Sequence, residues 1–149
     1  MSDIVRVIPF DRVRMRDLPD VGGKNASLGE MIGELAQAGV RVPGGFATTA
    51  AAFREFLAQD DLAGRIEGLL ERIDVADVPA LREAGTRIRD WILATPLPPA
   101  LVADIEVAYT ELARGHPDRS FAVRSSATAE DLPDASFAGQ QDTLLNING

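Results

Sequence analysis

The chain has 149 residues, of which 46% are hydrophobic and 26% charged, and its formal charge is −8 at pH 7. These are ordinary globular values with an acidic balance, so we expect neither disorder nor a nucleic-acid partner. There is no cysteine, which rules out disulfides, thiolate metal sites and cysteine nucleophiles.

The N-terminal residues lack the apolar core of a signal peptide. The longest uncharged window, residues 42–53, is too short to cross a membrane and contains proline and glycine. We therefore expect a soluble, cytoplasmic protein with no membrane partner.

The first half of the chain predicts short strands and one long helix. A strand is expected at Ile4–Ile8, followed by a charged connection at Asp11–Asp20. Apolar residues then recur at helical spacing, which predicts a helix from about residue 24 to residue 39. A proline-glycine turn over residues 40–45 leads into another short strand.

The start of this long helix combines glycines with a lysine. Gly22 and Gly23 precede the helix, where free N–H groups and the helix dipole favour an anion. Lys24 is the sole lysine among 15 basic residues, which is either chance in an arginine-rich chain or a functional choice. The stretch fits neither a Walker A loop nor a dinucleotide fingerprint.

The middle of the chain predicts four more helices. Thr48 or Thr49 would cap the first, whose buried face should carry Phe53, Phe56 and Leu57. Helical stripes follow over residues 62–73, 78–92 and 101–112. We interpret these stripes as core, Trp91 and Tyr109 included.

The sole histidine, His116, lies in a glycine-proline turn, and we expect it to be solvated.

The last part of the chain predicts a strand at Phe121–Arg124, a polar stretch and a final strand at Thr143–Ile147. The stretch between the strands begins with hydroxylated residues. An arginine beside hydroxyl and backbone N–H donors suits a phosphate chain, because its guanidinium presents a rigid fork of donors. Taken alone, the pattern also fits a strand followed by a capped turn.

Two separate stretches, Val21–Met31 and Ala122–Asn146, resemble the ATP-binding domain shared by phosphoenolpyruvate synthase, pyruvate phosphate dikinase and rifamycin phosphotransferase. Val42–Phe46 between them matches as well. The resemblance implies an α+β fold with short mixed strands and about five helices. Residues 1–149 would form a single partial domain, the first subdomain of an ATP-grasp-type unit.

The resemblance also implies roles for individual residues. Lys24 would contact the phosphates of ATP, and Arg124 would bind and neutralise them during transfer. A loop would close over the terminal phosphates with its backbone amides, and hydroxyl side chains would support the site. The loop residues are Gly139, Gln140 and Gln141, and the hydroxyl residues are Ser125, Ser126 and Thr128. The implied cofactors are ATP and Mg²⁺, with the metal ligands outside this chain.

The implied reaction converts pyruvate, ATP and water to phosphoenolpyruvate, AMP and phosphate through a phosphohistidine on another domain. The second ATP-grasp subdomain, the phosphohistidine domain and the pyruvate-binding domain would follow Gly149, in the same polypeptide or as a separate subunit. We therefore expect the isolated chain to be inactive and its open half-site to self-associate.

Three other hypotheses stay open on the sequence. A phosphotransferase of the same family could act on an antibiotic or phenolic acceptor. The chain could instead be a non-catalytic nucleotide-binding or assembly subunit, or an unrelated structural domain.

Overall fold

The computed structural model describes residues 4–40, 42–74, 76–115, 120–128 and 143–147. Helices and short strands are mixed along these residues, which confirms the predicted α+β class. Short 3-10 turns lie at Met15–Asp17 and Gln59–Asp61. The other elements are β1 (Val7–Pro9), α1 (Leu18–Val21), α2 (Gly23–Gln37), β2 (Phe46–Thr48), α3 (Ala50–Leu57), α4 (Leu62–Leu70), α5 (Val78–Ala94), α6 (Pro99–Ala113), β3 (Phe121–Arg124) and β4 (Thr143–Ile147).

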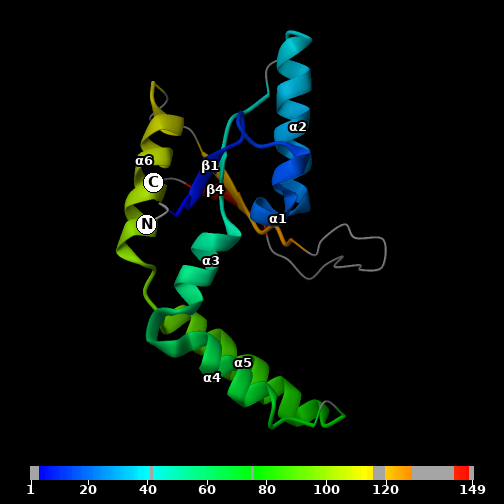
Figure 1. Ribbon diagram of the computed structural model, residues 1–149, viewed down its shortest axis with the longest axis vertical. Helices are drawn as coiled ribbons and strands as arrows, with labels where there is room; N and C mark the ends of the chain where they lie inside the picture. Colours follow the sequence, from blue (N-terminus) through cyan, green and yellow to red (C-terminus); the bar gives the residue numbers. More distant parts are fainter. Residues whose placement is uncertain (1–3, 41, 75, 116–119, 129–142, 148–149) are drawn as a thin grey trace.

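The strands pair into two small antiparallel sheets. In the first sheet β1 pairs with β2, and Ile8 lies opposite Ala47. In the second sheet β3 pairs with β4, and Arg124 lies opposite Thr143. Figure 1 shows the strands near the middle of the molecule, with α2 at one end and the α4–α5 hairpin at the other.

The core lies where β2, α1 and α2 meet the connection after β1. Val13, Val21, Ala26 and Ala47 are its buried residues. Ile8, Phe10 and Leu18 pack against them. The predicted charged connection therefore contributes core residues, because Val13 and the helical turn α1 fold back onto α2.

The predicted cap of α3 is Thr49. Its hydroxyl accepts a hydrogen bond from the N–H of Ala52 at 3.1 Å and donates one to the carbonyl of Val5 at 2.8 Å. The predicted buried face is partly wrong, because Phe53 is 58% exposed whereas Phe56 is 7% exposed. Ala52 and Phe56, four residues apart, form the inward face, and the ring of Phe53 stacks on that of Phe56.

The α4–α5 hairpin is less buried than its apolar stripes predict. Leu62 and Ala84 are buried, but Leu70, Val78 and Leu81 are exposed. These two helices contact each other and project from the rest of the molecule, so one face of each has no covering layer (Figure 1).

Among the described residues, no single helix has the length and apolar composition of a membrane span. Together α5 and α6 meet that test of length and composition, but they are bent by 73° at the break between them.

The side chain of Arg6, which precedes β1, forms ion pairs with residues of α3 and α6. Its guanidinium forms a two-pronged ion pair with Glu55 of α3, with distances of 2.7 Å from Nε to Oε2 and 3.1 Å from Nη2 to Oε1. Its Nη1 lies 3.5 Å from Oδ2 of Asp104 on α6. The hydrogen bond from Arg6 lowers the pKa of Glu55 below its ordinary value of 4.5.

Replacing Glu55 with glutamine should lower the melting temperature most at neutral pH. Because the folded-state pKa of Glu55 is lowered, its stabilising contribution is present above the unfolded value of 4.5 and is lost as the pH falls through the folded value. Thermal unfolding of wild type and Glu55→Gln from about pH 7 to about pH 3 should give melting temperatures that converge in acid. The exposed Glu67→Gln of α4 is the control and should follow the wild type throughout. A difference in melting temperature between wild type and Glu55→Gln that does not change with pH would contradict a stabilising role for the charge of Glu55.

Candidate functional site

α1 and α2 are separated by one residue, Gly22, at φ 82° and ψ 162°. This backbone region is essentially confined to glycine. Gly22 is the N-cap residue of α2 but supplies no side-chain oxygen to the helix. The first N–H groups of α2 therefore need partners from elsewhere.

Those partners come from the segment that follows β3. The N–H of Gly23 donates to the carbonyl of Ala127 at 3.3 Å, and the N–H of Asn25 donates to Oγ of Ser126 at 3.4 Å. Asn25 and Ser126 are 101 residues apart in the sequence. Figure 1 shows the orange segment after β3 running close to α1, next to the start of α2. The fold thus brings the stretch Val21–Met31 into contact with Ser126 and Ala127 of the stretch Ala122–Asn146. We call these two stretches the motif blocks and this contact the joint.

The joint is closely packed. A Cβ added to Gly22 would lie 2.4 Å from Oγ of Ser126 and 2.9 Å from the carbonyl oxygen of Ala127. On the other side, the side-chain amide of Asn25 donates to the carbonyl of Val21 at 2.9 Å and ties α2 to α1. Gly22, Asn25 and Ala127 were not among the predicted site residues. The sequence signal for Gly22 is the glycine pair before the helix start, and for Asn25 and Ala127 it is their place within the two motif blocks.

The predicted site residues that the structure describes lie on both sides of this joint. Lys24 is the second residue of α2 and is partly buried. Arg124 is the last residue of β3 and is exposed. Ser125 and Thr128 are exposed and Ser126 is partly buried. The predicted loop residues Gly139, Gln140 and Gln141 lie outside the described residues.

The N-terminus of α2 differs from the expected open anion site. Free N–H groups are expected there from the sequence, but those of Gly23 and Asn25 already donate to the segment after β3. Among the described residues of the two motif blocks, Lys24 and Arg124 carry the positively charged side chains. Each can act on a phosphate oxygen as a charge-assisted donor.

A metal site is not formed by the part of the chain that the structure describes. No three histidine, cysteine, aspartate or glutamate side chains gather there in a way that could hold an ion. These residues therefore do not provide a ligand set for Mg²⁺, which prefers several oxygen ligands in octahedral geometry.

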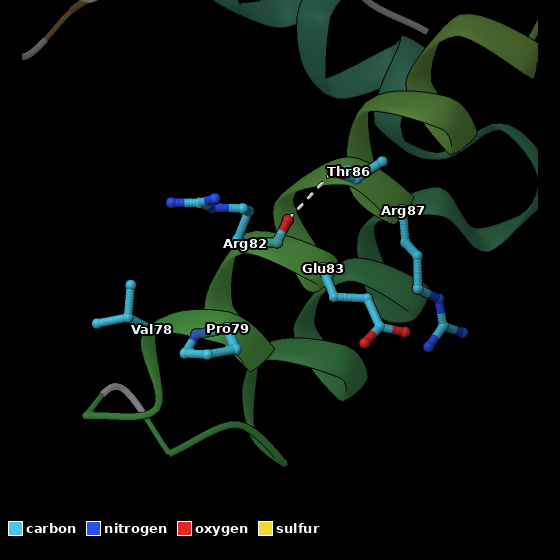
Figure 2. Close-up of a pocket in the computed structure, with 6 residues that line it drawn as sticks. All are labelled: Val78, Pro79, Arg82, Glu83, Thr86 and Arg87. Atoms are coloured by element: carbon cyan, nitrogen blue, oxygen red, sulfur yellow. Dashed lines mark hydrogen bonds between the residues drawn. The ribbon is translucent and has the colours of Figure 1, made fainter.

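Two hollows lie far from the joint, on the α4–α5 hairpin. One, of about 470 Å³, runs along α5, and Figure 2 shows Arg82 and Arg87 extending from opposite sides of this helix. The other, of about 270 Å³, lies between α4 and α5. There the guanidinium carbons of Arg65 and Arg87 lie 4.5 and 5.5 Å from the ring centre of Trp91. Trp91, predicted as core, thus packs under two arginines, and neither hollow includes a motif residue.

The sequence matches known proteins over most of its length. The family described as pyruvate phosphate dikinase, AMP/ATP-binding domain, matches residues 18–149. The chain is 61% identical over 145 residues to phosphoenolpyruvate synthase of Neisseria meningitidis serogroup B. It is 56% identical over 143 residues to that of Pseudomonas aeruginosa and 54% identical over 143 residues to that of Escherichia coli K12. Each match covers 96% of this chain but 18% of the relative.

Replacing Gly22 with alanine should destabilise the protein by on the order of 2 kcal/mol or more, because the new Cβ meets Ser126 and the backbone is strained. Gly39→Ala is the matched control, since Gly39 also has a positive φ of 76° but nothing within 4 Å of its Cβ position. Chemical denaturation should show a larger loss of stability for Gly22→Ala, which combines the clash with backbone strain, than for Gly39→Ala. Equal losses of stability would show that the contact with Ser126 does not matter.

Proposed function

The chain belongs to the pyruvate phosphate dikinase AMP/ATP-binding domain family, and on this premise we propose that it binds the phosphates of ATP between the start of α2 and the end of β3. The observation that carries this proposal is the joint itself, where the N–H groups of Gly23 and Asn25 meet Ala127 and Ser126. The joint links the start of the lysine-bearing helix to the segment that follows Arg124. In this proposal, Lys24 from one motif block and Arg124 from the other would each bind the same phosphate chain.

Charge supports this assignment. The protein carries a formal charge of −8, so it attracts a polyanion only where basic side chains are concentrated. No carboxylate within the described ranges forms an ion pair with Arg124. Phosphoryl transfer depends mainly on positioning and on neutralising negative charge. Lys24 would hold the phosphates, and Arg124 would in addition stabilise the charge that shifts during transfer.

We propose that this site serves a phosphoenolpyruvate synthase-like enzyme, because the relatives at 54–61% identity carry that name. Such an enzyme converts pyruvate, ATP and water to phosphoenolpyruvate, AMP and phosphate. Two phosphoanhydride bonds break: one phosphoryl group passes through a histidine to pyruvate, and water takes up the other as phosphate.

The chain spans about 18% of the length of these relatives. The rest of an ATP-grasp-type site, the carrier histidine and the pyruvate site are therefore assigned to other domains. Mg²⁺ would screen the phosphate charge, with ligands from the nucleotide and from those domains.

The β3–β4 sheet is the surface we assign to contacts with those domains. Every residue of β4 is exposed, and Val123, Leu144 and Leu145 are 52%, 57% and 66% exposed. Apolar side chains gathered on strands are typical of an interaction surface.

Without such a covering partner, the 149-residue protein should self-associate through this sheet. Sedimentation velocity should show a mass that rises with protein concentration, and Leu145→Ser should reduce this rise. A monomer at every concentration would contradict the prediction.

Removing either cationic side chain should weaken ATP binding. Because a hydrogen bond to a charged group contributes about 1.5–3 kcal/mol, Lys24→Ala and Arg124→Ala should each lower the affinity for ATP about 10-fold or more. Isothermal titration calorimetry with ATP and Mg²⁺ at low ionic strength is the measurement.

The matched control for this titration is Arg89→Ala, which removes an exposed arginine from α5 at the other end of the molecule. Its affinity for ATP should equal that of the wild type. Equal binding by wild type and by the Lys24→Ala/Arg124→Ala double variant would show that the site is assigned wrongly.

A further inference from the structure

At the start of α2, one residue occupies the N-cap position and another, far away in the sequence, supplies the capping oxygen. Gly22 occupies the N-cap position but has no side chain to accept a hydrogen bond. Its conformation at φ 82° and the close approach of Ser126 both require glycine at this position. The oxygen that accepts from the third residue of the helix, Asn25, is instead Oγ of Ser126. A helix start normally takes this oxygen from its own N-cap side chain.

Lys24 lies between two residues whose N–H groups donate hydrogen bonds to the segment after β3. The N–H of Gly23, before it, donates to Ala127, and the N–H of Asn25, after it, donates to Ser126. The backbone of Lys24 is therefore flanked on both sides by hydrogen bonds to the Ser126–Ala127 segment. That segment continues directly from β3, whose last residue is Arg124. These two hydrogen bonds thus connect the start of α2, which carries Lys24, to the segment that continues from Arg124.

We propose that Ser126 is a positioning residue for ATP binding: by capping α2 across 101 residues of sequence, it sets Lys24 relative to Arg124. This role rests on the proposed ATP site. It differs from a direct contact between Ser126 and the nucleotide. Ser126 is partly buried, its hydroxyl oxygen accepts from Asn25, and the backbone of Gly22 lies close to that oxygen. Ser126 therefore acts through Lys24.

A double-mutant cycle separates these roles. Ser126→Ala should lower the affinity for ATP about 3- to 10-fold when Lys24 is present, because a neutral hydrogen bond to the helix start is lost. In the Lys24→Ala background the same change should have no effect beyond about 1.5-fold, since there is no ammonium left to position. Equal losses in both backgrounds would overturn the proposal in favour of direct contact or a general structural role. No loss in either background would overturn it as well.

The matched control is Ser27→Ala. It removes a hydroxyl from α2 at an exposed position whose side chain contacts Met15 and not the segment after β3. This variant should bind ATP as the wild type does. A loss equal to that of Ser126→Ala would overturn the proposal, because it would show that any hydroxyl removed near the start of α2 has the same effect.

Amide hydrogen exchange tests the joint without ATP. Ser126→Ala should raise the exchange rate of the Asn25 amide at least about 5-fold, while amides in the middle of α2 keep their rates. An unchanged Asn25 rate would overturn the capping role even if ATP affinity fell. If the wild type binds no ATP, the proposed function fails and the positioning role fails with it. A raised Asn25 rate would then leave Ser126 as a cap only.

Discussion

The start of α2 is held against the segment after β3 by the N–H groups of Gly23 and Asn25, and the geometry of the candidate site depends on this contact. A backbone N–H at a helix start must find an acceptor, and leaving it unpaired in a buried place costs free energy. Gly22 cannot supply that acceptor, so the segment carrying Ser126 and Ala127 supplies it. The same requirement that completes the helix brings the two motif blocks together.

The rest of the fold supports the two sides of this contact by different means. On the α2 side, Val13, Val21 and Ala26 form a buried cluster, and Gly29 leaves room for it, since a Cβ there would lie 2.6 Å from Val13. The β3–β4 side has little burial. It is attached through the ring of Phe121, which packs on Tyr109 of α6 with 5.0 Å between ring centres.

Features that depend on local sequence were predictable, whereas features that depend on contacts between distant parts of the chain were not. The α2, α5 and α6 helices and the strands that end at Arg124 and Ile147 follow from local periodicity, turn residues and prolines. Periodicity failed where burial depends on a second layer. Phe53 and Leu81 are apolar at helical spacing but exposed, and Trp91 packs under arginines. A stripe shows which face could be buried, and only a neighbouring element determines whether it is.

For the candidate site, the sequence by itself determined the chemistry. One lysine after two glycines and one arginine before two serines supply the charged donors that the proposed phosphate site requires. The tertiary structure decided which backbone N–H donors at the start of α2 already have hydrogen-bond acceptors. The N–H groups expected to receive an anion are bonded to Ala127 and Ser126, and Asn25 takes part in the joint. The physical reason is that every residue except proline carries the same backbone N–H group, so the sequence does not specify its partner. The acceptor is determined by the groups that lie next to it in space. For α2, that neighbour comes from 101 residues further along the chain.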